Sequence, residues 1–329
     1  MRRLLPLFAL LGAGEAGAQV AAEPVSPLAP GVWLLPGGIR PERQPDGNTI
    51  IFQAPKGLIV MDTGRHAWQR EAILAFARSQ RQPVVAIINS HWHLDHVSGN
   101  PGLRSAWPGL KVYASAAIDA ALTGFLAKSA GDAPRYLADT TLPAATREDI
   151  GNDLATIRGG TALRPDVVIA ASRTMTIGGR TLRVNLAVNA ATAGDVWVYD
   201  SRSHIAALGD LVTLPAPFLD TACPDGWRTA LAQVAATPFS TVIPGHGAAM
   251  SRTHFALYRA AFDSFIDCAR STSAPRLCAA NWASMVKPLL GTDPQASRQA
   301  KGMAAYYVDL LRAHRGNSAY CATVPAAPG

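Results

Sequence analysis

The segment from residue 84 to residue 96 constrains the fold more than any other part of the sequence. It begins with the apolar run Val84–Ile88, which is typical of a strand buried on both faces of a sheet. It ends with His91–Trp92–His93–Leu94–Asp95–His96, where four of six side chains are ionisable. Such side chains are costly to bury unless a metal ion or strong pairing satisfies them. The segment therefore predicts an α/β fold with a polar site at the carboxyl end of a buried strand.

Imidazole and carboxylate groups are the ligands that zinc takes in four- or five-coordinate sites. His91 and His93 alternate, so at an extended strand end they point to the same side. The adjacent Asp95 and His96 then turn the chain so that both of these side chains can face inward. A polar turn with solvated histidines is the alternative, but the buried strand before the segment favours a metal site.

Two later loops offer one further ligand each. Gly209–Asp210 ends a predicted strand, and Pro244–Gly245–His246–Gly247 follows another. Glycine lets a backbone approach a metal centre closely. Asp210 or His246 alone would more often be a turn residue than a ligand. Together with the first segment they complete six candidate metal ligands, namely His91, His93, Asp95, His96, Asp210 and His246.

Five motifs follow one another in the order Asp62–Thr63–Gly64, His91-x-His93-x-Asp95–His96, Gly194–Asp195, Gly209–Asp210 and Gly245–His246–Gly247. Over roughly residues 31 to 260, this series resembles the motifs of the metallo-β-lactamase superfamily. The resemblance implies a four-layer αββα sandwich with a metal site at one edge between its two sheets. It also implies one or two zinc ions, with His91 and His93 at metal one, Asp95, His96 and His246 at metal two, and Asp210 as a bridge.

One position departs from the family pattern. The family usually has a histidine three residues before the glycine of its third motif, and this chain has Ala191 there. Alanine cannot ligate, so metal one keeps only His91, His93 and Asp210 unless Asn189 or water compensates. The expected outcomes are a single-ion site, a site that takes two ions only at high metal concentration, or a site reduced to a binding role.

The apolar patterns predict the remaining elements. Strands are expected at 31–35, 49–53, 57–61, 111–114, 167–170, 174–177, 181–188, 195–199, 204–208 and 240–243, and helices at 67–80, 115–128, 227–236, 252–270, 279–290 and 296–315. The predicted organisation is a signal peptide at 1–18, a metallo-β-lactamase-like domain at 19–260 with a helical insertion at about 129–165, and a C-terminal helical extension at 261–329 packed on the same domain.

The first residues have the three parts of a signal peptide: basic Arg2–Arg3, apolar Leu4–Leu11 and the small residues Ala16–Ala18. Cleavage would leave Gln19 as the first mature residue. The apolar run is too short to span a bilayer, so we expect a periplasmic or secreted protein with no membrane contact after cleavage.

In an exported protein the four cysteines can form disulfides, because an oxidising compartment permits them. Four cysteines allow three pairings, and the sequence does not choose among them. Cys268 and Cys278 are close in sequence and form the preferred pair, which leaves Cys223 and Cys321.

The formal net charge of +7 is scattered along the chain without a basic run, so a nucleic-acid partner is not expected. A small-molecule substrate fits the metal site, and nothing indicates the oligomeric state.

The sequence thus predicts an enzyme: a secreted zinc-dependent hydrolase that uses metal-activated water on an ester, thioester, lactone or related bond. Asp95 and Asp210 are the predicted catalytic residues, because they would orient and hold the attacking water. Two alternatives stay open, a β-lactam hydrolase and a non-catalytic periplasmic metal-binding accessory protein. A diiron oxidoreductase is disfavoured, because its branch of the family carries a carboxylate where this chain has His93.

Other polar residues are weaker candidates. His66 is expected to begin a helix at the surface, and His204 to be a strand histidine with its hydrogen bonds satisfied. His254 and His314 are expected at the surface of helices. The loop Pro215–Trp227 follows Asp210 directly and is a candidate to line a pocket.

Overall fold

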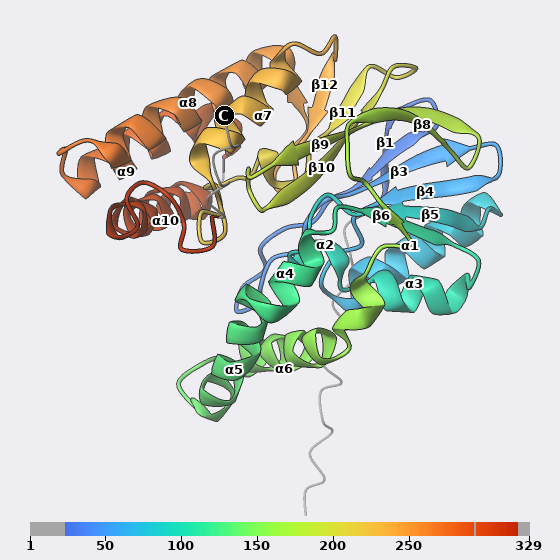
Figure 1. The fold of residues 1–329 in the computed structure, drawn as a ribbon, viewed down its shortest axis with the longest axis horizontal. Coiled ribbons are helices and arrows are strands. Elements are labelled where there is room, and N and C mark those ends of the chain that lie inside the picture. The colour runs from blue at the N-terminus through green and yellow to red at the C-terminus, as the bar shows by residue number, and fades with distance from the viewer. Residues whose placement is uncertain (1–23, 293, 322–329) are drawn as a thin grey trace, which may run out of the picture.

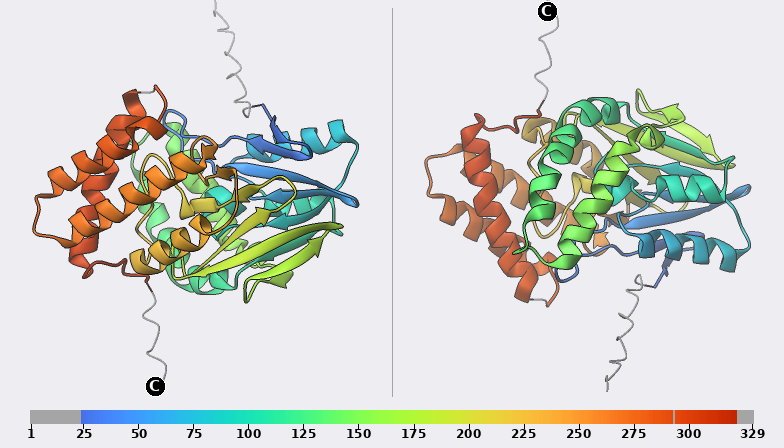
Figure 2. Two further views of the ribbon diagram at one scale, coloured as in Figure 1. Left: turned by 90° about the horizontal axis from the view of Figure 1, so that it is seen from above. Right: turned by 90° about the horizontal axis from the view of Figure 1, so that it is seen from below.

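The computed structural model describes residues 24–292 and 294–321. Two β-sheets pack face to face, and helices cover the outer face of each, so the chain forms an αββα sandwich (Figures 1 and 2). The four-layer α/β fold expected from the sequence is confirmed. The predicted signal peptide and its cleavage site lie outside the described residues.

The first sheet has seven strands and contains the buried strand of the ligand segment. Its order is β1 (Ser26–Ala29), β2 (Val32–Leu35), β3 (Thr49–Ala54), β4 (Gly57–Met61), β5 (Val84–Ile88), β6 (Lys111–Ala114) and β7 (Val167–Val168). Strands β1 to β4 pair antiparallel, and β4 to β7 pair parallel. Parallel neighbours need crossover connections, which α1 (Ala67–Gln80) and α3 (Asn100–Ala106) provide on the outer face of this sheet.

The second sheet has six strands, mostly antiparallel. Its order is β13 (Met250–Ser251), β12 (Thr241–Ile243), β11 (Ile205–Ala207), β10 (Gly194–Asp200), β9 (Arg180–Val188) and β8 (Arg173–Ile177). Strands β11 and β12 are the parallel pair, so the loops after both strands leave the sheet at the same edge. That geometry brings the Asp210 loop beside the His246 loop.

Apolar side chains from both sheets fill the space between them. Phe52 and Ile59 of the first sheet pack in one buried cluster with Val184, Val196 and Val198 of the second. Buried and exposed positions alternate at the start of β9, as expected for a strand with one buried face. The two sheets thus form one rigid base for the loops at their edge.

A helical segment connects β6 to β7 and lies beside the edge that carries the ligand segment. It contains α4 (Ala117–Thr123), α5 (Phe125–Ala138), α6 (Ala144–Arg158) and the 3-10 helix η1 (Gly160–Leu163). The single helix predicted at 115–128 is wrong, because the chain breaks at Gly124, where ψ is −104°. Glycine is a poor helix residue, and here it separates α4 from α5.

Four helices pack on the outer face of the second sheet and beside it: α7 (Pro224–Ala235), α8 (Arg252–Arg270), α9 (Pro275–Val286) and α10 (Pro294–Ala313). Trp227, Tyr258, Phe262, Trp282 and Val308 are among the buried residues of their shared core. None of the helices in the described ranges is both long and apolar enough to cross a bilayer.

Two disulfides tie this helical part together. The expected pair Cys268–Cys278 is confirmed, and Cys223–Cys321 is the second bond. The second bond joins the start of α7 to the segment after α10.

The two disulfides should differ in their effect on stability. Cys223–Cys321 spans 98 residues and Cys268–Cys278 spans 10, and the entropy that a cross-link removes from the unfolded chain grows with loop length. We expect Cys223→Ser/Cys321→Ser to lower the free energy of unfolding by about 5 kcal/mol, and Cys268→Ser/Cys278→Ser by about 3 kcal/mol. Urea denaturation of both variants checks this, and a larger loss for the second variant would contradict it.

Candidate metal centre

The six candidate ligands come from four places along the chain and meet at one edge of the sandwich. His91 and His93 follow β5, and Asp95 and His96 lie in the short helix α2 (Leu94–Val97). Asp210 lies in the 3-10 helix η2 (Gly209–Leu211) after β11, and His246 in the loop after β12. All six side chains are buried or nearly so.

Two glycines make this convergence possible. A Cβ atom on Gly245 would lie 2.0 Å from Asp210 Oδ1, and one on Gly47 would lie 2.4 Å from the His96 ring. Any other residue would push a candidate ligand out of place. The motif around His246 predicted the first close approach, whereas Gly47 was missed because it lies in no recognised motif.

Five of the six ligands form two overlapping groups whose ligand atoms lie within 4.8 Å of one another. One group is His91, His96 and Asp210, and the other is Asp95, His96 and His246. His96 Nε2 lies 3.2 Å from Asp210 Oδ1, and His246 Nε2 lies 3.0 Å from Asp95 Oδ2.

The residues present fit a divalent cation. His91 Nε2 and Asp210 Oδ1 are buried and have no hydrogen-bond partner within the described residues. Buried polar atoms without partners are costly, and coordination to a metal ion would satisfy both. A mixed imidazole and carboxylate donor set suits zinc.

The pKa values show how strongly the charges interact. Burial lowers the pKa of His96, but Asp210, Asp95 and Asp62 outweigh burial and raise it well above its usual value. Burial raises the pKa of Asp210, but His96 and His246 outweigh burial and lower it. The imidazoles and carboxylates of the cluster thus attract each other strongly, as expected of groups gathered around one small space.

Asp62, from the first motif, orients His96. Asp62 Oδ2 lies 2.9 Å from His96 Nδ1, and Asp62 also accepts hydrogen bonds from the backbone N–H and the hydroxyl of Ser90. Because Nδ1 is used in this way, Nε2 of His96 is the nitrogen left for the ligand cluster. A carboxylate that holds a metal-binding imidazole in this way is a common support of metal sites.

His93 belongs to neither ligand group, and burial lowers its pKa to about 4. Its Nε2 lies 3.1 Å from the hydroxyl of Thr221, which also lies 2.9 Å from the carbonyl of Ala191. The Thr221 hydroxyl has one proton and donates it to this carbonyl, so it accepts the hydrogen bond from His93 Nε2–H. His93 Nδ1 is then the ring nitrogen with a free lone pair.

Thr221 was missed by sequence reasoning, although the loop that contains it was singled out. A lone threonine gives no signal of its own. Its partner is the backbone of Ala191, the position that lacks the family histidine. Asn189, the predicted substitute ligand, begins the turn from β9 to β10 with φ of 52°, and its N–H donates to Ala193 O.

Asp195 of the third motif holds the same turn from inside. It accepts hydrogen bonds from the backbone N–H and the hydroxyl of Thr192 at 2.9 and 3.1 Å. Burial raises the pKa of Asp195 to about 7, although the hydrogen bonds from Thr192 act in the opposite direction.

His66 begins α1 as predicted, but the prediction that it lies at the surface is wrong, because it is 7% exposed. Its Nδ1 lies 2.7 Å from Asp46 Oδ2, and its Nε2 lies 3.2 Å from Asp149 Oδ1 of α6. Two buried carboxylates that are distant in sequence thus surround it, and no local pattern predicts this. Next to it, Arg65 pairs with Asp153 of α6.

The other weak candidates lie away from the ligands. His204 lies in a turn before β11 with φ of 54°, so its placement on a strand is wrong, and its Nδ1 lies 3.2 Å from the Tyr199 hydroxyl. His254 is exposed on α8, as expected, whereas His314 is exposed in the turn directly after α10, and there it lines the cavity above the ligands.

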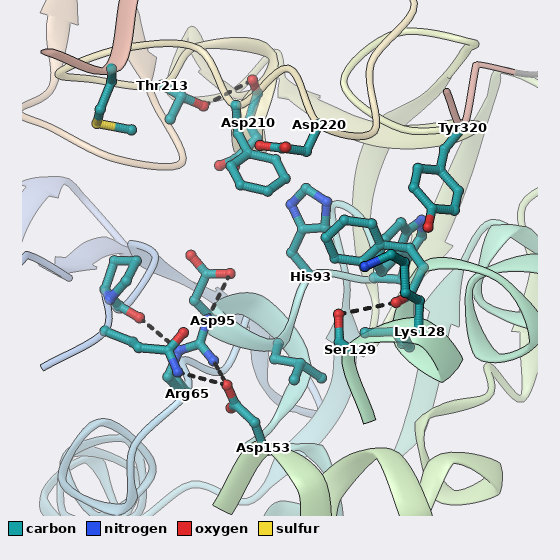
Figure 3. A pocket seen from close by; sticks show the side chains of 18 of the residues that line it. Arg65, His93, Asp95, Lys128, Ser129, Asp153, Asp210, Thr213, Asp220 and Tyr320 are labelled. Atoms are coloured by element: carbon teal, nitrogen blue, oxygen red, sulfur yellow. Dashed lines mark hydrogen bonds and ion pairs between the residues drawn. The ribbon is translucent and has the colours of Figure 1, made fainter. Parts of the chain in front are cut away.

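A cavity of about 650 Å³ opens above the ligands. Figure 3 shows His93, Asp95 and Asp210 reaching into the same space as Tyr320, Lys128 and Arg65. Phe218 and Asp220 of the loop 215–227 also line it, as expected of that loop. The ligand groups are therefore accessible to a small molecule.

Comparisons with known proteins agree with this geometry. Residues 43–246 match the family profile described as Metallo-beta-lactamase superfamily. A linear primary-alkylsulfatase from Pseudomonas sp. (strain ATCC 19151) is 40% identical over 50 residues, which is 15% of this chain and 10% of that protein.

Solved structures share the fold at low sequence identity. A metallo-beta-lactamase from Pontibacter korlensis has a TM-score of 0.53 and 20% identity, and the match covers 73% of this chain and 98% of that one. The stereoselective inverting sec-alkylsulfatase Pisa1 from Pseudomonas sp. has a TM-score of 0.59 and 18% identity, and the match covers 92% of this chain. The chain spans about half of that sulfatase structure, 52% of its length.

Removing the Thr221 hydroxyl should weaken metal binding. In Thr221→Val the buried His93 Nε2–H loses its acceptor, so the ring is no longer held in place. We expect the zinc affinity to fall roughly 10- to 100-fold, as for other groups that orient metal ligands. Thr221→Ser keeps the hydroxyl and should retain most of the affinity. Competition with a chromophoric chelator measures both, and equal affinity of the valine variant and the wild type would refute the role.

Asp195 should make stability depend on pH. Its folded pKa of about 7 lies above the unfolded value of 3.8, so its contribution is fully present at low pH and is lost as the pH rises from about 4 to about 7. Asp195→Asn mimics the protonated form and should abolish this loss. Urea denaturation of both proteins at several pH values gives the difference in unfolding free energy. A constant difference across this range would contradict the raised pKa.

Proposed function

Because the chain belongs to the metallo-β-lactamase superfamily, we propose that it is a zinc-dependent hydrolase that cleaves an ester, thioester, lactone or related bond of a small molecule. The observation that carries this proposal is the set of imidazole and carboxylate groups at the floor of a cavity. Two of these groups, His91 and Asp210, have buried atoms that make no hydrogen bond among the described residues, and Asp210 Oδ1 faces the His96 and His246 rings at 3.2 and 3.6 Å.

The six candidate ligands are proposed to hold one or two zinc ions. Zinc supplies Lewis acidity and lowers the pKa of water, so that a nucleophile exists near neutral pH. Asp62 and Thr221 fix the orientation of the His96 and His93 rings.

Asp95 and Asp210 are proposed as the catalytic carboxylates, because both line the cavity. Asp95 Oδ1 lies 3.8 Å from Arg65 Nη2, and its Oδ2 lies 3.0 Å from His246 Nε2. These contacts fix the carboxylate where it can accept a proton from, or orient, a water molecule in the cavity. Asp210 Oδ1 and Oδ2 lie between His96 and His91, so it connects the two sides of the site.

We also propose that the protein is exported to the periplasm or beyond. The basic, apolar and small-residue regions at residues 1–18 support this. The two disulfides support it as well, since disulfides persist in oxidising compartments.

Loss of a ligand should abolish both metal binding and hydrolysis. We expect mass spectrometry of the purified protein to show one or two zinc ions. His246→Ala and Asp210→Ala should each lose bound zinc and lower kcat/KM more than about 100-fold, because removing a direct ligand has a larger effect than removing a residue that only orients a ligand. His254→Ala is the matched control, because this histidine is exposed on α8, and it should retain zinc and activity.

A panel of ester, thioester, lactone, phosphoester and β-lactam substrates tests the reaction class. Turnover of β-lactams alone would support a β-lactam hydrolase instead. A zinc-loaded protein that turns over none of them would support an accessory metal-binding protein.

A further inference from the structure

We propose that the substrate carries a large apolar group without charge, held in the cavity between α5, α6 and α10, beside the bond that is cleaved. This inference rests on the proposed function and names the class of molecule on which the site would act. The cavity of about 650 Å³ has the size of a small-molecule site.

An apolar wall begins at the ligands and leads away from them. The Phe218 ring lies 4.9 Å from the His93 ring, and Phe125 lies 6.4 Å beyond Phe218. Phe125 in turn lies 5.3 Å from Tyr320, which follows α10. A chain bound along these rings would start at the reacting centre and extend towards the helices.

The helices on both sides continue this apolar surface. Leu154 and Ile157 of α6 line the cavity from one side, and Met303 and Leu310 of α10 from the other. α5 and α6 pack on each other, whereas α10 belongs to the core of the second sheet. The cavity therefore lies between two separately supported helical walls, as is usual for small-molecule sites with apolar linings.

The charges that line the cavity are already paired. Arg65 forms an ion pair with Asp153, and Lys128 lies 2.7 Å from Asp132. These are the lysine and arginine side chains among the described lining residues. An anionic group on the bound chain would compete with an aspartate for either cation, and the buried Arg65 is the more firmly paired of the two.

The lining has more acid than base. Away from the candidate metal ligands it includes Asp132, Asp153 and Asp220, and Asp220 accepts a hydrogen bond from the Tyr306 hydroxyl at 2.8 Å. A carboxylate or sulfate at the far end of a bound chain would therefore meet like charge. An apolar chain without charge meets none of these costs and gains the burial of its surface.

A second hollow beside His246 is also lined by apolar and uncharged residues. Its volume is about 470 Å³, and it shares Ile39, Leu214 and His246 with the main cavity. The rest of its lining is apolar or neutral and includes Asn48 and Gln299. The ligands thus lie between two hollows, which would receive the two sides of an uncharged substrate.

The first experiment is a chain-length series of 4-nitrophenyl esters from acetate to decanoate, hydrolysed by the zinc-loaded protein. We expect kcat/KM to rise roughly three- to fourfold per methylene, the factor that burial of one CH₂ group gives, until the cavity is full. A matched pair isolates the effect of charge: the octanoate ester and the octanedioate monoester, which has a carboxylate at its far end. We expect the anionic ester to react at least tenfold more slowly.

Variants connect these effects to the cavity. Phe125→Ala and Met303→Gln should lower kcat/KM for the octanoate ester at least tenfold and leave the acetate ester within twofold. The matched control is Ala127→Ser on α5, an exposed position outside the lining, which should change neither substrate. Thermal unfolding of each variant shows whether it folds, and Met303→Gln replaces a half-buried side chain by one of similar length.

Binding of N-phenyl-1-naphthylamine, an uncharged apolar fluorescent probe, separates failure of this inference from failure of the proposed function. Probe binding that octanol displaces and that Phe125→Ala weakens supports the apolar site even if no substrate of the panel is cleaved, in which case the proposed reaction is wrong. Ester hydrolysis that is independent of chain length overturns the inference but leaves the hydrolase intact. Hydrolysis of the octanedioate monoester as fast as that of the octanoate ester would also overturn it.

Discussion

The site depends on the burial of one imidazole among three carboxylates. His96 is fully buried, and its two ring nitrogens lie near Asp62 on one side and Asp210 and Asp95 on the other. Such a concentration of charge is tolerated only where each group has a partner. The surrounding backbone is arranged accordingly, since Gly47 leaves room for the His96 ring. The edge of the sandwich is therefore organised by electrostatic pairing, and the cores of the two sheets hold its parts in place.

The C-terminal helices contribute to this edge although they lie far from it in sequence. The loop that contains Thr221 is fixed by the Cys223–Cys321 disulfide, by a hydrogen bond from Ser318 N to Ala222 O, and by one from Cys223 N to Ala190 O. The last of these bonds connects the loop to the turn that carries Ala191. The segment after α10 thus supports the residue that orients His93, and it supplies Tyr320 to the cavity wall.

A structural feature could be predicted from the sequence where neighbouring residues in the chain determine it. Strand β5 and helix α1 were predicted at their observed bounds, because apolar continuity and helical spacing are local signals. Three of the five motifs contain the six candidate ligands, and the fold brings these motifs to one edge of the sandwich. The break at Gly124, the burial of His66 and the role of Thr221 were not predicted. The last two depend on contacts between segments distant in sequence, such as Asp149 of α6 on His66, and no spacing encodes them. The break at Gly124 has a local cause, a glycine within a helical pattern, which the periodicity alone did not reveal.

The overlap of the two ligand groups limits how the candidate ligands could be shared between two metal ions. His96 has committed Nδ1 to Asp62, so its single free nitrogen, Nε2, can serve one metal ion only. An ion that takes His96 together with Asp95 and His246 has three protein ligands from one group. The other position then keeps His91 and Asp210, with His93 as a third ligand only if its free Nδ1 turns towards them. Thr221 accepts a hydrogen bond from His93 Nε2–H and donates one to the carbonyl of Ala191, so the position of the missing histidine is connected to a remaining one through a single hydroxyl.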